Sequence, residues 1–286
     1  MKEKNIMQNM LLEKARLFEQ DAEQQISASD RPCFHLSSRV GWMNDPNGFS
    51  FFNGQFHLFY QYHPYSNAWG PMHWGHAVTA DLLRWDYLPA ALAPETAADN
   101  RGCFSGSAIT VENADGTAAH LLMYTGLVQA GADGAAQTLL QQQCLALGDG
   151  LNYRQLEANP VLTQADLPEG YSPLDFRDPK LFRTANGSYY AVIVGRKPDG
   201  LGSILLFESA DAKAWSFHSV LAENAGQLGK MWECPDLLQM AGNAALLFSV
   251  QDNLATDQHT HSGDCTMYYL GKFDEATGDF APESLH

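Results

Sequence analysis

The chain has 286 residues, of which 45% are hydrophobic and 17% charged, and its formal net charge at pH 7 is −16. This length allows one large all-β domain or two smaller domains. The acidity disfavours nucleic acid and anionic membrane surfaces as partners, so we expect a globular protein that binds neither of them.

The five cysteines are widely spaced and include no Cys-x-x-Cys pair. This pattern predicts neither a disulfide framework nor a zinc site. Residues 1–30 carry several charges and lack the apolar core of a signal peptide. No stretch approaches the ~20 apolar residues of a membrane span. We therefore expect a cytoplasmic protein that binds no metal and no other cofactor.

Residues 5–24 are predicted to form one amphipathic helix, because Met7, Leu11 and Phe18 follow helical spacing and proline is absent. From about residue 31 the chain changes to short aromatic and β-branched runs separated by Gly, Asn, Asp and Pro, which is typical of consecutive antiparallel strands. We expect residues 1–30 to be a helix with a linker, and residues 31–286 to be an all-β domain.

Four hairpin signals recur along the all-β part, each with a two-residue turn between apolar runs. The turns begin at residues 53, 115, 186 and 242, at intervals of 56 to 71 residues. Units of this size with several strands each predict the blades of a β-propeller, and four blades are visible. The turns are Asn53-Gly54, Asp115-Gly116, Asn186-Gly187 and Gly242-Asn243.

Three carboxylates, Asp45, Asp178 and Glu233, stand in proline-containing segments eight or nine residues ahead of a turn, and Ser105 stands ten residues ahead of the second turn. If the blades superimpose, these side chains occupy equivalent places on the innermost strands and converge on the central channel. The alternative is that the Asp-Pro and Gly-rich segments are ordinary turns. Repetition in register favours convergence, and two carboxylates flanking a glycosidic bond are the equipment of a glycosidase.

Six further segments of the chain form a recognisable set: Trp42–Gly48, Gln61–Pro64, Trp74–Ala77, Phe104–Ser107, Phe176–Lys180 and Glu233–Asp236. In their order and spacing they resemble glycoside hydrolase family 32, which contains invertases, sucrose-6-phosphate hydrolases and fructanases. The match runs from about residue 34 to residue 280. The resemblance implies a five-bladed propeller followed by a β-sandwich, so a chain ending at His286 would lack the fifth blade and the sandwich. We therefore expect self-association through the open sector and weak activity.

The resemblance also implies a mechanism, in which a retaining β-fructofuranosidase hydrolyses sucrose or sucrose 6-phosphate. Asp45 matches the nucleophile that forms a fructosyl-aspartate intermediate, and Glu233 matches the general acid that then acts as the base. Asp178 matches the carboxylate that binds fructose hydroxyls. The small sugar substrate is thus the expected partner.

Further positions are candidates for binding the sugar. Arg177 can contact sugar beside Asp178 only if the strand is bulged or begins there, because successive strand residues face opposite sides; otherwise it pairs with a carboxylate. Phe104 fits either a pocket wall or the core. By resemblance, the fructose pocket is shaped by Asn44, Gln61, Trp69 and Ser105.

Other readings remain open at this stage. The acceptor could be a second sugar, which would make the protein a fructosyltransferase, and the propeller could bind carbohydrate without catalysis or be inactive. A phosphate on the substrate would need basic residues, for which Arg101, Arg196 and Lys230 are scattered candidates.

Overall fold

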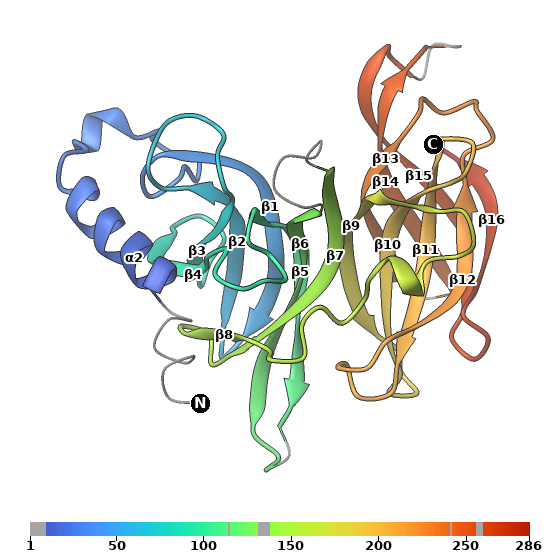
Figure 1. Ribbon diagram of the computed structural model, residues 1–286, viewed down its shortest axis with the longest axis horizontal. Coiled ribbons are helices and arrows are strands. Elements are labelled where there is room, and N and C mark those ends of the chain that lie inside the picture. The colour runs from blue at the N-terminus through green and yellow to red at the C-terminus, as the bar shows by residue number, and fades with distance from the viewer. Residues whose placement is uncertain (1–9, 114, 131–137, 241, 256–259) are drawn as a thin grey trace. The chain divides into compact units, whose positions relative to one another are not determined.

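The computed structural model describes residues 10–113, 115–130, 138–240, 242–255 and 260–286 (Figure 1). These segments contain one α-helix, α2 (Met10–Glu23), and two short 3-10 helices at Ala28–Asp30 and Gln164–Asp166. The expected helical residues 5–9 lie outside the described residues. No helix in the described segments is long and apolar enough to cross a bilayer.

All other regular structure is β, in four sheets of four strands that pair in chain order. This arrangement confirms the prediction of an all-β fold with four propeller blades behind an N-terminal helix. The first sheet contains β1 (Trp42–Phe52), β2 (Gln55–His63), β3 (His73–Thr79) and β4 (Asp86–Leu92). The second contains β5 (Gly102–Glu112), β6 (Ala118–Ala130), β7 (Thr138–Gly148) and β8 (Tyr153–Gln155).

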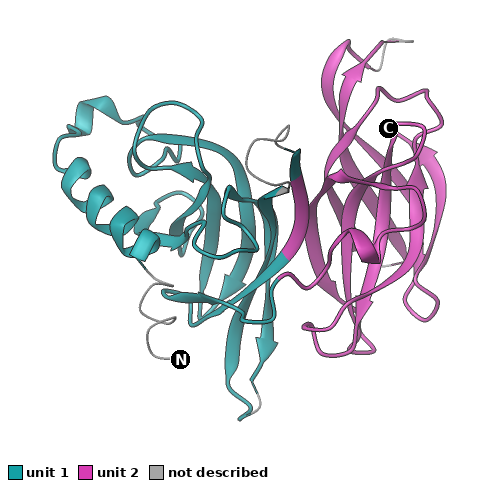
Figure 2. Cartoon of the chain, in the orientation of Figure 1, with its two compact units in different colours: residues 1–139, 144–159 teal, residues 140–143, 160–286 magenta. Residues whose placement is uncertain are grey.

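The third sheet contains β9 (Ser172–Arg183), β10 (Tyr189–Arg196), β11 (Gly202–Ser209) and β12 (Ser216–Glu223). The fourth contains β13 (Trp232–Met240), β14 (Asn243–Asn253), β15 (Gly263–Asp274) and β16 (Asp279–Leu285). The chain divides into two compact units, coloured in Figure 2. Unit 1 comprises residues 1–139 and 144–159, and unit 2 comprises residues 140–143 and 160–286.

Three hairpin turns lie where the sequence predicts them, between the first two strands of their sheets. The fourth prediction, Gly242-Asn243, is one residue too late, because Asn243 already belongs to β14 and pairs with Met240. Asn53 and Gly54 have φ angles of 49° and 82°, as a type I′ turn requires. The first strands begin earlier than the apolar runs indicated, because β1 already includes Asp45 and Pro46. The turn interpretation of this segment is therefore wrong. Proline is tolerated there because β1 is an edge strand of its sheet.

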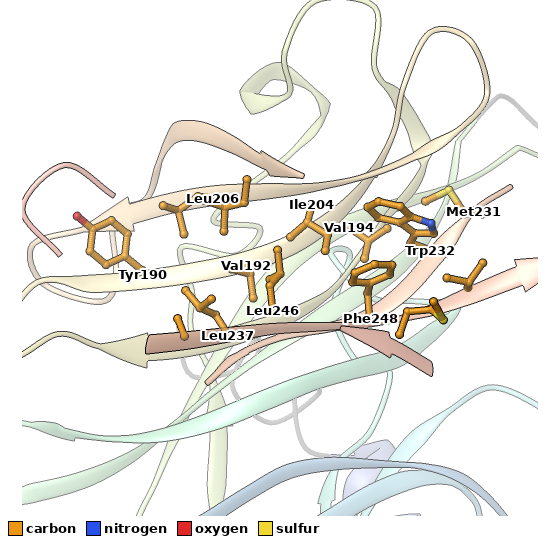
Figure 3. Packing of buried hydrophobic residues seen from close by; sticks show 14 residues of the cluster. Tyr190, Val192, Val194, Ile204, Leu206, Met231, Trp232, Leu237, Leu246 and Phe248 are labelled. Atoms are coloured by element: carbon orange, nitrogen blue, oxygen red, sulfur yellow. The ribbon is translucent and has the colours of Figure 1, made fainter. Parts of the chain in front are cut away.

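In unit 2, the third and fourth sheets share one hydrophobic core (Figure 3). Val192 and Ile204 from the third sheet pack in the same cluster as Leu246, Phe248 and Trp232 from the fourth sheet. Full burial of such a side chain contributes roughly 1.5–3 kcal/mol. This core therefore fixes β9 and β13, the strands that carry Asp178 and Glu233.

The core of unit 1 contains aromatic side chains and, beside them, buried histidines. His57 Nδ1 lies 3.0 Å from His76 Nε2, and His120 lies within hydrogen-bond distance of Ser50 and Tyr153, at 2.9 and 2.8 Å. Burial lowers the pKa of His57, lowers that of His76 well below its ordinary value, and lowers that of His120 to about 3. These imidazoles are therefore neutral in the folded protein.

Replacing His120 by Gln should weaken the dependence of stability on pH. His120 has a pKa of about 3 when folded and about 6.5 when unfolded, so the unfolded chain binds more protons as pH falls through 6.5. Its contribution to the free energy of unfolding should fall by about 1 kcal/mol between pH 7.5 and 5.5. Buried Glu95, with a pKa raised by burial to about 7, acts in the opposite direction.

The measurement is therefore a comparison between variants, by urea unfolding at the two pH values. The stability loss on acidification should be about 1 kcal/mol smaller in His120→Gln than in the wild type. His35→Gln, at an exposed histidine, is the control and should behave as the wild type. An unaltered pH dependence in His120→Gln would contradict the neutral buried state of this imidazole.

Helix α2 packs on the first sheet, at its outer strand β4. Glu19 accepts hydrogen bonds from the Ala90 N–H at 2.9 Å and the Tyr62 hydroxyl at 3.3 Å, and pairs with Arg39 at 3.1 Å. Arg16 Nε donates to the Ala90 carbonyl at 2.9 Å. The two helix side chains thus bond both backbone groups of Ala90, and they protect an edge that would otherwise be open to another strand.

Replacing Glu19 by Ala should destabilise unit 1 by about 3 kcal/mol, because it leaves the Arg39 charge and the Ala90 N–H without this partner. Glu19 is only 1% exposed, so water cannot easily replace the lost contacts. Glu13→Ala is a matched control, since that side chain is 60% exposed and pairs only loosely with Arg16, at 3.5 Å. Equal unfolding free energies for the two variants would show that Glu19 does not anchor the helix.

Candidate active site

The first strand of every sheet contains a two-residue β-bulge near its predicted functional residue. At each bulge two residues face a single residue on the second strand, which re-aims the side chains. Consecutive residues of a regular strand face opposite sides of the sheet, whereas a bulge allows two neighbouring polar residues to act on the same side. The pairs are Asn44-Asp45 facing Gln61, Phe104-Ser105 facing Thr125, Asp178-Pro179 facing Ile193, and Cys234-Pro235 facing Phe248.

In unit 1, Asp45 lies half-buried in a network of donors from β1 and β5. Ser105 Oγ donates to one carboxylate oxygen at 2.8 Å, and Asn44 Nδ2 donates to the other at 3.2 Å. Trp42 Nε1 in turn donates to Asn44 Oδ1 at 3.0 Å. Each donor stabilises the negative carboxylate and fixes its orientation. The arrangement suits a nucleophile held at a defined angle.

The other candidates of unit 1 divide into buried and exposed side chains. Gln61 is 2% exposed and donates to the Cys103 carbonyl at 3.0 Å, so it holds the start of the β5 bulge. Trp69 is 58% exposed and meets Phe104 edge to face, with ring centroids 6.3 Å apart. Trp69 is the exposed member of this aromatic pair, and Phe104 is half-buried; an accessible aromatic face of this kind can stack against a sugar ring.

In unit 2, the Arg177 guanidinium lies among three carboxylates. NH1 donates to Asp175, NH2 donates to Glu233 Oε1 at 3.1 Å, and Nε is 3.7 Å from Asp178 Oδ2. Burial lowers the pKa of Arg177, but the charges of Asp178, Asp175 and Glu233 outweigh it and raise the pKa above its ordinary value. Arg177 is therefore a permanent positive charge between Asp178 and Glu233.

The bulges that carry Asp178 and Cys234 share an unusual backbone conformation. Both residues have positive φ, 61° for Asp178 and 49° for Cys234, and both precede a proline. The Cys234 N–H donates to Asp178 Oδ2 at 3.0 Å, which ties the two bulges together. Strained backbone of this kind persists only where neighbouring contacts hold it, and it is concentrated at functional sites.

The structure gathers the predicted residues into two groups, one in each unit. Asn44, Asp45, Gln61, Trp69, Phe104 and Ser105 lie in unit 1, whereas Arg177, Asp178 and Glu233 lie in unit 2. The sequence left two possibilities for Arg177: contact with sugar from a bulged strand, or pairing with a carboxylate. Its strand is bulged beside it, and Arg177 also pairs with carboxylates, so the conditions for both are met. The sugar-binding and catalytic roles of these residues stay predictions.

Four further residues of unit 2 lie around the candidate site. Three of them, Asp175, Gln141 and Gln143, were missed in the sequence, and Arg196 was considered there only for a phosphate site. The spacing of Asp175 and Arg177 was a usable signal, because strand residues two apart share a face. Gln141 and Gln143 on β7 hold both backbone groups of Phe176: Gln141 Oε1 accepts from its N–H at 2.9 Å and Gln143 Nε2 donates to its carbonyl at 2.7 Å. The fourth is Arg196, which pairs with Asp175.

The three basic candidates for a phosphate site all have polar partners. Arg101 donates to Gln129, Arg196 pairs with Asp175, and Lys230 lies 3.2 Å from Asp252. Across the described segments no group of three or more His, Cys, Asp or Glu side chains is arranged to hold a metal ion.

The described segments define an all-β protein of the propeller class, with Asp45, Asp178 and Glu233 on the first strands of three of its four blades. The model of the glycosyl hydrolases family 32 N-terminal domain matches residues 35–286. The chain therefore belongs to family 32 of the glycosyl hydrolases.

Two curated relatives illustrate the match. A sucrose-6-phosphate hydrolase of Zymomonas mobilis is 37% identical over 270 residues, which cover 91% of this chain and 50% of the relative. A raffinose invertase of Escherichia coli is 41% identical over 221 residues, which cover 77% of this chain and 44% of the relative. The chain spans about half the length of the relatives it matches.

Solved structures agree with this assignment. A family 32 β-fructofuranosidase of Bombyx mori superimposes with a TM-score of 0.82 at 39% identity, covering 96% of this chain and 56% of that one. A mutant of the same enzyme has been solved with sucrose. A sucrose-6-phosphate hydrolase of Lactobacillus gasseri gives a TM-score of 0.76 at 30% identity, with 93% and 52% coverage.

Proposed function

We propose that this chain carries the catalytic residues of a retaining β-fructofuranosidase, with sucrose or sucrose 6-phosphate as its substrate. The observation that carries the proposal is the setting of the three predicted carboxylates. Asp45 is oriented by two donors, and Asp178 and Glu233 flank a buried arginine. The names of the matched relatives support sucrose and its phosphate as the substrate class.

In the proposed first step, an Asp45 oxygen attacks C2 of the fructosyl unit while Glu233 gives a proton to the departing glycosidic oxygen. The C2–oxygen bond to glucose breaks, and a fructosyl-aspartate ester forms. Glu233 then takes a proton from water, whose oxygen attacks C2 and releases Asp45. A double displacement of this kind uses two carboxyl groups that lie ~5–5.5 Å apart.

Asp178 and Arg177 are proposed to bind the fructosyl hydroxyls. Asp178 accepts hydrogen bonds from hydroxyls, and Arg177 donates them. Contacts that shorten as the sugar flattens towards the oxocarbenium ion lower the barrier, because they are stronger in the transition state than in the ground state. The exposed Trp69 ring and the half-buried Phe104 ring are proposed as apolar contacts for the sugar.

Fructose release from sucrose and from sucrose 6-phosphate, measured for the purified 286-residue chain, tests the proposal, because fructose is the product that the two reactions share. The comparison of kcat/KM between the two substrates decides which is preferred. Products formed at high sucrose concentration separate hydrolysis from fructosyl transfer, since transfer yields fructosylated sugars. Sugar binding without turnover of either substrate would refute the enzymatic proposal and favour a carbohydrate-binding propeller.

Two further properties stay proposals. A cytoplasmic location is one, and cell fractionation tests it. Self-association is the other, and it is supported by exposed apolar side chains on the face of the fourth sheet opposite its core, among them Leu238, Met240 and Tyr268. Sedimentation equilibrium of the purified chain measures it, and a purely monomeric result would contradict it.

A further inference from the structure

Asp175 occupies a special position beside the candidate acid. It lies on β9 two residues before Arg177, is 9% exposed, and has both carboxylate oxygens engaged. Oδ1 accepts a hydrogen bond from Arg177 NH1, and Oδ2 accepts from Arg196, with which it forms an ion pair. One buried carboxylate thus bridges two guanidinium groups.

The guanidinium of Arg177 is planar, so holding one of its edges sets the direction of the others. Each nitrogen of Arg177 faces a different carboxylate: NH1 faces Asp175, Nε faces Asp178 and NH2 faces Glu233. Asp178 and Glu233 are proposed to engage substrate during turnover. Asp175 is the partner that has no part in that chemistry and can hold the group throughout.

The charges of the cluster are nearly balanced. Asp175, Asp178 and Glu233 supply three carboxyl groups, and Arg177 and Arg196 supply two positive charges. A buried carboxylate between two arginines is compensated on both sides, which is the condition under which a buried charge is tolerated. Arg196 therefore supplies a second positive partner for the Asp175 carboxylate.

We propose that Asp175 is a positioning residue, which holds the Arg177 guanidinium in the orientation that contacts Asp178 and Glu233. This inference rests on the proposed function, since Asp178 and Glu233 acquire their roles there. Loss of Asp175 would leave Asp178 and Glu233 in place but release the arginine between them. Misplacement of such a group by about 1 Å costs on the order of 100-fold in rate.

Asp175→Asn is the test variant, because it keeps the size of the side chain and removes its charge. Two readouts are taken on the 286-residue chain: the side-chain nitrogen NMR signals of Arg177, assigned with Arg177→Lys, and kcat and KM for sucrose. In the wild type we expect separate Arg177 Nη signals, because rotation of a held guanidinium is slow. In Asp175→Asn these signals should merge, and kcat should fall about 100-fold while KM changes little.

Asp199→Asn is the matched control, since Asp199 forms an exposed pair with Lys197 in the same unit. It should leave both readouts unchanged. Asp175→Glu retains the charge and serves if Asp175→Asn does not fold. This variant should shift the Arg177 signals and give an intermediate kcat, because its carboxylate lies one carbon further out.

Arg177 signals that are the same in the wild type and in every folded Asp175 variant would overturn the proposal, whatever the activity. Merged signals with an unchanged kcat would equally overturn it. A wild-type chain without sucrose turnover would refute the proposed function instead. The Arg177 signals would still decide whether Asp175 holds this side chain.

Discussion

Replacing Asp45 by Asn should lower sucrose turnover by on the order of 10⁴-fold or more, because an amide cannot form the fructosyl ester. The fold should be retained, since an Asn side chain has nearly the same volume and its carbonyl can still accept the hydrogen bond from Ser105 Oγ. The expected result is therefore a loss of kcat with little change in stability or in sucrose affinity.

Initial rates of glucose release and urea unfolding curves check this expectation together. Asp86→Asn, at an exposed position of β4, is the control in the same unit and should keep wild-type kinetics. Residual activity in Asp45→Asn near that of the control would show that Asp45 is not the nucleophile. A large loss of stability would show instead that the hydrogen-bonded carboxylate has a mainly structural role.

The second large effect is expected for Glu233→Gln, and its size should depend on the leaving group. A glucose leaving group needs a proton, so sucrose turnover should fall by about 10²–10⁴-fold. An aryl β-fructofuranoside with an acidic phenol leaves without protonation and should retain most of its rate of fructosyl transfer to the enzyme. The contrast follows from the side-chain chemistry, since glutamine cannot donate the proton of a carboxylic acid.

The appropriate measurement is the ratio of the two rates in Glu233→Gln relative to the wild type, taken from the first turnover. Glu169→Gln, an exposed position of unit 2, should leave that ratio unchanged. Equal losses on sucrose and on the aryl substrate would contradict the acid role of Glu233. They would point to a shared effect, such as displacement of Arg177, whose NH2 group donates to this carboxylate.

Local turn chemistry explains why the hairpins could be predicted from the sequence. A pair such as Asn53-Gly54 has few alternatives to a type I′ turn, and its place between apolar runs fixes the hairpin. The strand limits were harder to predict. Asp45 and Pro46 belong to β1 because an edge strand tolerates proline at a bulge, and this depends on sheet position, which local sequence does not reveal.

The candidate site was predictable in its residue types but not in its connections. Spacing and family resemblance indicated Asp178 and Glu233, whereas the link between them through Arg177 depends on two bulges that pack against each other. Asp175 and Arg196 meet across two paired strands, with Arg196 opposite Ser172 on β9. A contact of this kind is set by strand register, and one residue of slippage would remove it.

The docking of α2 illustrates the same limit. Its amphipathic pattern predicted a helix, but nothing in the pattern identified the surface that it covers. The contacts of Glu19 and Arg16 with Ala90 answer that question, because they bond the outer edge of β4. Both side chains are charged, and a charged side chain is buried only where it finds polar partners. In α2 these partners are backbone groups of the sheet, so the helix does not pack against a purely apolar face.

The stereochemistry of the first product tests the central claim most directly. Sucrose is mixed with the 286-residue chain, and the released fructose is followed by rapid NMR before its anomers equilibrate. A double displacement through Asp45 predicts that β-fructofuranose appears first, with the configuration of the substrate. Initial release of the inverted anomer, or no release of fructose, would contradict a retaining mechanism at these carboxylates.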